Sequence, residues 1–209
     1  LVDGNKSNQS SGSMRAIYMD GMGSGTTVEG AKIDNVTAIN ASSYGIRLVS
    51  SNNNSVTDST FNNNYRGIGT SSAQNNSIAN NTVDSNNFGI SVNSSQSITL
   101  NNNNANNSVS SGISVDSSQY ITMTANTANS NGTVGISVSY SPDTLMAANT
   151  ANSNGTVGIE ILSSNNTVSN NTANGNTLYG ISLNGGSNNT VTGNTVQSNS
   201  DRGISLYGG

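Results

Sequence analysis

The sequence predicts an all-β fold, a right-handed single-stranded parallel β-helix of about eight to nine coils with 22 to 23 residues each. Gly-Ile pairs recur in steps of 22 or 23 residues, and other apolar columns keep the same step. Within the repeats apolar and polar residues alternate, as in "GISV" and "GISL", which is the period of a strand and not of a helix. Short strands repeated at this length are typical of a β-solenoid, with three strands expected per coil.

Four apolar columns are expected to form a narrow core along the whole solenoid. The first is Ile33, Val56, Ile78, Leu100, Met123, Met146, Val168 and Val191, and the second is Ala38, Phe61, Val83, Ala105, Ala128, Ala151, Ala173 and Val196. The third consists of the Gly-Ile isoleucines, and the fourth is Leu48, Thr70, Val92, Val115, Val138, Ile161, Leu183 and Leu206. A core this narrow needs few apolar residues, which agrees with a hydrophobic fraction of 31%.

Two asparagine-rich columns are expected to form ladders, because identical amides stacked in register can hydrogen-bond one another. One is Val36, Ser59, Asn81, Asn103, Asn126, Asn149, Asn171 and Asn194, and the other is Ala41, Asn64, Asn86, Ser108, Asn131, Asn154, Asn176 and Asn199. Asparagine tolerates the left-handed backbone of sharp turns, and the glycine before each isoleucine is expected to meet the same need.

The repeats divide the chain into an irregular start and a regular body. Residues 1–25 are expected to form an irregular first coil or amino-terminal cap, in which Ala16-Ile17 is a displaced Gly-Ile pair, and residues 26–209 form the repeats. The chain starts without Met and stops in mid-coil, so we expect a segment of a longer protein, with end-to-end self-association as one way to cover the last strand.

The first coils concentrate arginine and aromatic residues at one edge of one face. These are Tyr44, Arg47, Tyr65, Arg66 and Phe88, in a chain with only seven Tyr and two Phe. Aromatic rings stack on sugar faces, and arginine binds carboxylates through two parallel hydrogen bonds. The cluster therefore predicts a binding site for an acidic, uronate-containing polysaccharide or surface glycan.

The repeat pattern "NNTVSNNTANGNTLYGISL" resembles that of NosD-type and carbohydrate-binding or sugar-hydrolase β-helix proteins. At the front, "LVDGNKSNQ" followed by "VTAINASSYGI" is similar to the start of mannuronan C5-epimerase catalytic modules, whose Tyr-Gly-Phe-Asp-Pro-His motif supplies the site. Here the matching stretch is "YGIRLV", so Tyr44 is retained, while Arg47 and Val49 replace the aspartate and histidine. This resemblance implies that, if the chain is an enzyme, Tyr44 and Arg47 are its catalytic residues.

Composition excludes several other classes of function. The chain has no His and no Cys, so zinc, iron and copper sites lack their usual ligands, and no metal site or cofactor is expected, although the carboxylates of Asp20, Asp34 and Asp143 leave calcium open. The acidic residues are scattered, without the carboxylate pair of a glycosidase. A net charge of −4 argues against nucleic acid as a partner, and no transmembrane run is present.

The favoured reading is a secreted or cell-surface module of a prokaryotic protein that acts as a rigid glycan-associated scaffold or polysaccharide-binding domain. The first alternative is a uronate-active polysaccharide lyase or C5-epimerase-like enzyme centred on Tyr44. The second is an ice-binding solenoid, because a threonine column, from Thr37 and Thr60 through to Thr195, lies beside an asparagine column in the manner of some antifreeze solenoids.

Overall fold

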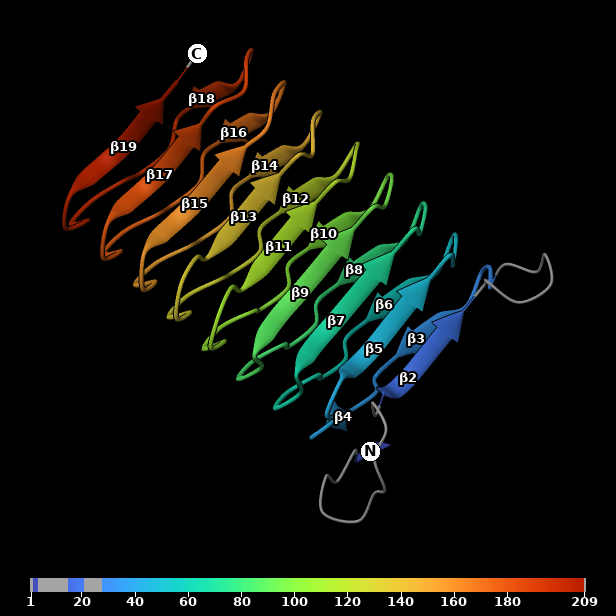
Figure 1. The fold of residues 1–209 in the computed structure, drawn as a ribbon. Helices are drawn as coiled ribbons and strands as arrows, with labels where there is room; N and C mark the ends of the chain where they lie inside the picture. The colour runs from blue at the N-terminus through green and yellow to red at the C-terminus, as the bar shows by residue number, and fades with distance from the viewer. Residues whose placement is uncertain (1, 4–14, 21–27, 209) are drawn as a thin grey trace.

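The computed structural model describes residues 2–3, 15–20 and 28–208, and these form a straight stack of parallel coils from the amino end to the carboxyl end (Figure 1). Most of the region of residues 1–25 therefore lies outside the described residues. No helix among the residues described has the length and hydrophobicity needed to span a bilayer.

Two parallel sheets run the length of the stack (Figure 1). The larger contains the Gly-Ile strands, namely β2 (Arg15–Asp20), β5 (Tyr44–Val49), β7 (Arg66–Ser71), β9 (Phe88–Asn93), β11 (Ile113–Asp116), β13 (Ile136–Ser139), β15 (Val157–Leu162), β17 (Tyr179–Asn184) and β19 (Arg202–Tyr207). The smaller contains β3 (Lys32–Asp34), β6 (Ser55–Thr57), β8 (Ser77–Ala79), β10 (Thr99–Asn101), β12 (Thr122–Thr124), β14 (Leu145–Ala147), β16 (Thr167–Ser169) and β18 (Thr190–Thr192). A separate pair joins β1 (Val2–Asp3) to β4 (Ala38–Ile39).

The register of the strands follows the sequence repeat. Ile17 of β2 lies opposite Ile46 of β5, which is the register expected of the displaced Ala16-Ile17 pair. Each later Gly-Ile isoleucine lies opposite its equivalent in the next coil, as Ile113 does to Ile136. Equivalent positions in successive coils are therefore direct neighbours.

The expected third strand is reduced to single residues that bridge one coil to the next. Thr37, Thr60, Thr82, Asn104, Thr127, Thr150, Thr172 and Thr195 form such a file of parallel bridges. A second file, which was not expected, joins Glu29, Asn52, Gln74, Gln96 and Gln119. The coils as far as Gln119 thus have two strands and two bridging positions, and the later coils keep only the bridge of the threonine file.

The four apolar columns line the interior as predicted, and side chains such as Ile68, Leu100 and Met123 are fully buried. At the carboxyl end the core opens, since Ile204 is 44% exposed and Leu206 71% exposed. Ile98 and Ile121 add a buried position outside the predicted columns. Because a fully buried aliphatic side chain contributes about 1.5–3 kcal/mol, this single narrow core stabilises every coil.

The buried asparagines are hydrogen-bonded from coil to coil. The side-chain oxygen of Asn126 accepts from both the backbone N–H and the side-chain amide of Asn103, at 3.0 Å each. Asn126 in turn donates through its backbone N–H and side-chain amide to the side-chain oxygen of Asn149. The second column makes the same contacts between Asn131, Asn154 and Asn176.

The expectation that the glycine of each Gly-Ile pair adopts a left-handed backbone is wrong. The left-handed residues instead stand at the corners of each coil, as in Ser50, Asn53, Asp58 and Asn63 of one coil. The glycines are needed because their neighbours approach too closely for a side chain. A Cβ atom on Gly112 would lie 2.6 Å from the Asn131 amide nitrogen and 2.7 Å from the Ala105 carbonyl oxygen.

Candidate functional site

Three neighbouring strands bring the predicted arginine and aromatic residues together. Tyr44 of β5 lies opposite Arg66 of β7, which lies opposite Phe88 of β9. Because each of these residues comes directly before a Gly-Ile glycine, the repeat that builds the core also stacks the three side chains outside it.

The Arg66 guanidinium lies among three aromatic rings. Its central carbon is 5.4 Å from the centre of the Tyr44 ring, 5.1 Å from that of Tyr65 and 5.0 Å from that of Phe88. Arg47 stands over the Tyr44 ring at 5.0 Å. A cation within about 6 Å of a ring centre is attracted by the π-electrons, so the rings fix both guanidiniums in place.

Gly69 allows Tyr44 to lie over the neighbouring strand. Gly69 is the partner of Arg47 in the register of β5 and β7. A Cβ atom on Gly69 would come within 2.4 Å of the Tyr44 ring, so any other residue there would displace the ring. The position of the Tyr44 ring thus depends on Gly69, which stands in a column that otherwise carries mainly serine.

These residues form the wall of a surface groove of about 300 Å³, which we call the arginine groove. It is lined by Tyr44, Arg47, Arg66, Gly69, Thr70, Ser71, Phe88, Ser91, Val92, Asn93, Ser111, Ser114 and Asp116. Four of the five predicted binding residues therefore line one groove. Tyr65 is 41% exposed and packs edge-on against Phe88 from outside the lining, with ring centres 5.7 Å apart.

The charges in the groove favour a ligand that is anionic at one end and polar along the rest of its length. Two guanidiniums stand at one end, and Asp116 is the acidic residue of the lining. The ion pairs in the described part of the chain are Lys32–Asp34 and Asp201–Arg202, so neither Arg47 nor Arg66 is neutralised by a carboxylate there. The serine and asparagine side chains of the lining offer further hydrogen bonds to a hydroxylated ligand.

The two predicted catalytic residues, Tyr44 and Arg47, are in contact in this groove. The groups that could exchange a proton with a ligand there are the Tyr44 phenol and the Asp116 carboxyl, and the guanidiniums could stabilise developing negative charge. The sequence prediction did not include Asp116, which reaches the groove because β11 follows β9 in the sheet.

The carboxylates considered for calcium do not converge where the structure describes them. No group of three acidic side chains that could hold a metal occurs among the described residues. Asp34 instead accepts hydrogen bonds from Lys32 and Thr57, which lower its pKa, the Thr57 bond most. Asp143 accepts a bond of 2.9 Å from the Gln119 amide.

A second arginine–aromatic cluster stands at the carboxyl end of the larger sheet. The Arg202 guanidinium carbon is 5.6 Å from the ring centres of both Tyr179 and Tyr207, and Arg202 donates a hydrogen bond to the Tyr207 hydroxyl. The hydrogen bond between the two hydroxyls raises the pKa of Tyr179 and lowers that of Tyr207. Arg202 does not line the arginine groove.

The threonine column considered for ice binding runs along one face as the file of bridges described above. Beside it the side-chain oxygens of Asn106, Asn129 and Asn152 accept hydrogen bonds from the backbone N–H of the next coil, at 2.7–2.8 Å. These amides are therefore held in a regular row. Ice binding by this face stays a prediction.

The comparison with protein families covers nearly the whole chain. The family described as right handed beta helix region matches residues 15–163 and 88–209, in two overlapping stretches. This match confirms the predicted handedness of the solenoid. No curated protein matches the sequence at a significant level.

Solved structures with the same fold include two epimerases and a tailspike protein. The periplasmic alginate epimerase AlgG has a TM-score of 0.66 at 18% identity, covering 91% of this chain and 58% of that one. The A-module of the Azotobacter vinelandii mannuronan C-5 epimerase AlgE6 has a TM-score of 0.62 at 16% identity, covering 85% and 64%. The Dettilon tailspike protein has a TM-score of 0.58 at 13% identity, covering 84% and 51%. This chain thus spans about half to two thirds of their length.

Proposed function

Because the chain belongs to the family of right-handed β-helix proteins, we propose that it is a rigid polysaccharide-binding module that takes an acidic, uronate-containing glycan in the arginine groove. The observation that carries the proposal is the Arg66 guanidinium held among the rings of Tyr44, Tyr65 and Phe88 at the edge of that groove.

The geometry suits a sugar carboxylate. A guanidinium that stacks on a ring still presents its N–H groups at its edge, where a carboxylate can accept two parallel hydrogen bonds. Because stacking already restricts Arg47 and Arg66, less side-chain entropy is lost when a ligand binds. The rings offer an apolar face against which a pyranose ring can pack.

The setting of the module is part of the proposal. A stack of coils braced by amide hydrogen bonds and stabilised without cysteine suits a scaffold in an envelope or extracellular matrix. Structures with the same fold include a periplasmic enzyme and a tailspike, which supports a place outside the cytoplasm. We propose that the module is secreted or displayed at a prokaryotic cell surface.

The proposal is tested with the double variant Arg47→Gln/Arg66→Gln and oligomers of mannuronate and galacturonate. Calorimetric titration should show affinity for a uronate oligomer in the unchanged protein and a loss of at least about tenfold, or 1.4 kcal/mol, in the variant. Binding should also weaken as salt is raised, because the partly exposed charges are screened.

Arg202→Gln is the matched control, because it removes a guanidinium stacked on two rings at a site away from the groove. Its affinity should equal that of the unchanged protein. Equal affinity of the double variant and the unchanged protein for every uronate oligomer would contradict the proposal.

A uronate-active enzyme is the second candidate, favoured by the position of Tyr44 between two guanidiniums in the groove. Such an enzyme would remove the C5 proton of a uronate, and the arginines would stabilise the resulting anion. Incubation with polymannuronate, followed by proton NMR and ultraviolet absorbance, distinguishes the two functions. Product that disappears in Tyr44→Phe would favour the enzyme, whereas binding without product favours the module.

A further inference from the structure

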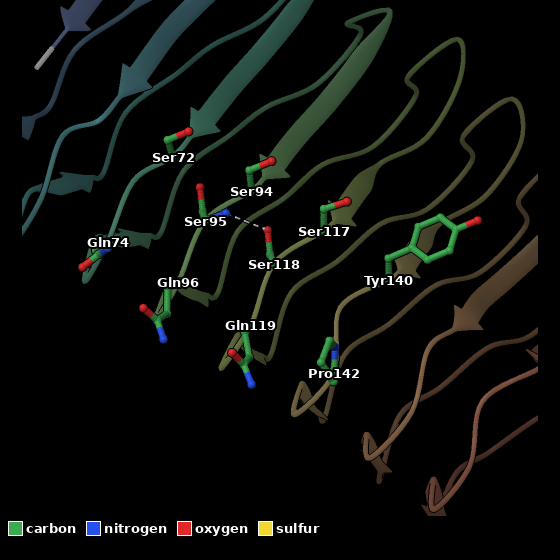
Figure 2. Close-up of a pocket in the computed structure, with 10 residues that line it drawn as sticks. All are labelled: Ser72, Gln74, Ser94, Ser95, Gln96, Ser117, Ser118, Gln119, Tyr140 and Pro142. Carbon is green, nitrogen blue, oxygen red and sulfur yellow. Dashed lines mark hydrogen bonds between the residues drawn. The ribbon is translucent and has the colours of Figure 1, made fainter. Parts of the chain in front are cut away.

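A second groove lies on the other side of the corner that follows the Gly-Ile strands (Figure 2). It encloses about 490 Å³ and is lined by Ser72, Gln74, Ser94, Ser95, Gln96, Ser117, Ser118, Gln119, Tyr140 and Pro142. We call it the glutamine groove. Ser71, Asn93 and Asp116 of the arginine groove each immediately precede one of its serines, so the two grooves are separate but adjacent.

Two files of equivalent residues build the walls of the glutamine groove. Ser72, Ser94 and Ser117 occupy the same left-handed corner in successive coils, and Gln74, Gln96 and Gln119 bridge one another in parallel. Both files are broken in the next coil, where Tyr140 stands in the place of serine and Pro142 in that of glutamine. Figure 2 shows the Tyr140 ring at this end of the groove.

Tyr140 has two features that do not stabilise the fold. Its side chain is 77% exposed, and its φ of 47° lies in the left-handed region that bulky residues rarely adopt. The serines at the equivalent corners have similar angles, of 51°, 46° and 49°, so the corner is set by the repeat. Strained, exposed aromatic residues tend to occur at binding sites, and a ring in this place offers a flat face to a ligand.

The groove also offers hydrogen bonds without charge. Where the structure describes the chain, the side-chain amides of Gln74 and Gln96 make no hydrogen bond to other residues, and Gln119 donates to Asp143. By contrast, the hydroxyls of Ser95 and Ser118 are already bonded to backbone groups. The lining contains no ionisable side chain other than Tyr140. This combination suits a ligand with many hydroxyls and no net charge.

We propose that the glutamine groove binds a neutral polysaccharide chain laid along the solenoid axis, with one pyranose ring packed on Tyr140 and the glutamine amides bonded to sugar hydroxyls. The coils repeat at about 4.8 Å, a step close to the length of one pyranose unit in an extended chain. Successive glutamines can therefore each reach a unit of such a chain. The site differs in chemistry from the arginine groove and does not depend on it.

The test uses cellohexaose and mannohexaose, two neutral hexasaccharides, with the variant Tyr140→Ser. This change restores the residue that stands at the equivalent corners, so the fold should be kept, as a urea unfolding curve can confirm. We expect at least one hexasaccharide to perturb the Tyr140 ring signals in NMR spectra, and its dissociation constant to rise about tenfold or more in Tyr140→Ser.

Tyr120→Ser is the matched control, because Tyr120 is also exposed and left-handed, with a φ of 56°, but does not line the groove. It should bind the hexasaccharide as the unchanged protein does, and so should Arg47→Gln/Arg66→Gln. If neither hexasaccharide binds at millimolar concentration, or if Tyr140→Ser binds as well as the unchanged protein, the proposal is wrong. Either result leaves the uronate site of the arginine groove untouched.

Discussion

Gly135 shows why some positions of the repeat cannot accept a residue larger than glycine. It is buried between coils, and a Cβ atom there would lie 2.7 Å from the Asn154 amide nitrogen, 2.7 Å from the Gly158 carbonyl oxygen and 2.9 Å from the Ala128 carbonyl oxygen. Two of these contacts are with backbone, which cannot move without shifting a whole coil. The glycine column therefore fixes how closely the coils stack.

We expect Gly135→Ala to lower the free energy of unfolding by about 1–3 kcal/mol, the usual cost of overpacking a well-packed interior. Urea unfolding followed by circular dichroism measures the change. Ser139→Ala on the same strand is the control, because Ser139 faces outward and is half-buried, and it should change stability by no more than about 0.5 kcal/mol. Unchanged stability of Gly135→Ala would contradict the packing argument.

At the scale of one element, the Asn126–Asn149–Asn171 file connects three coils through buried amides. The Asn149 side-chain amide donates to the Met123 carbonyl and to the Asn171 side-chain oxygen. Its oxygen accepts from the backbone and side chain of Asn126. All four bonds are between groups with little access to solvent, so water cannot replace them.

We expect Asn149→Ala to cost more than the loss of one ordinary hydrogen bond, because it leaves several buried groups of the adjacent coils without a partner. Each such group costs about 1–3 kcal/mol. Thermal unfolding should show a clear fall in the midpoint for Asn149→Ala and almost none for Thr150→Ala, whose side chain is half-exposed in the same coil. Equal midpoints for the two variants would mean that these amide bonds do not stabilise the stack.

The strands could be predicted where the spacing of the repeat alone determines them. They could not be predicted where the turns determine how long a strand is. The spacing of the apolar columns predicted the two long sheets and their register. The third strand is short because left-handed residues at Asp58 and Asn63 leave only four residues between two corners. Those corners carry Ser, Asn, Asp, Ala or Gly in different coils, so no single residue type in the sequence indicates them.

At the scale of the whole molecule, each coil contacts only its neighbours, and chemistry concentrates where the repeat is interrupted. The sequence predicted the arginine groove because Tyr44, Arg66 and Phe88 share one column. It missed the glutamine groove, since Tyr140 is recognisable as unusual only once the corner that it shares with Ser72, Ser94 and Ser117 is known. A cluster of side chains is therefore easier to predict in the strands than in the turns.

The stability of the whole molecule should depend on pH in part through Glu160. The chain holds few charges, and Glu160 lies between Ser137 and Ser182 on the larger sheet, half-buried. Burial raises the pKa of its carboxyl above the ordinary 4.5, and a hydrogen bond with Ser137 only partly opposes this. Because the folded state then binds the proton more tightly than the unfolded state, this group lowers stability as pH rises through that range.

We therefore expect Glu160→Gln to be more stable than the unchanged protein at about pH 7 and to lose that advantage at about pH 3, where the carboxyl is protonated in both states. Urea unfolding at the two pH values measures the difference. Asp34 acts in the opposite direction, because its lowered pKa stabilises the fold at pH values above its ordinary 3.8, but it is present in both proteins and cancels in the comparison. An advantage of equal size at both pH values would show that the substitution acts through packing and not through the buried charge.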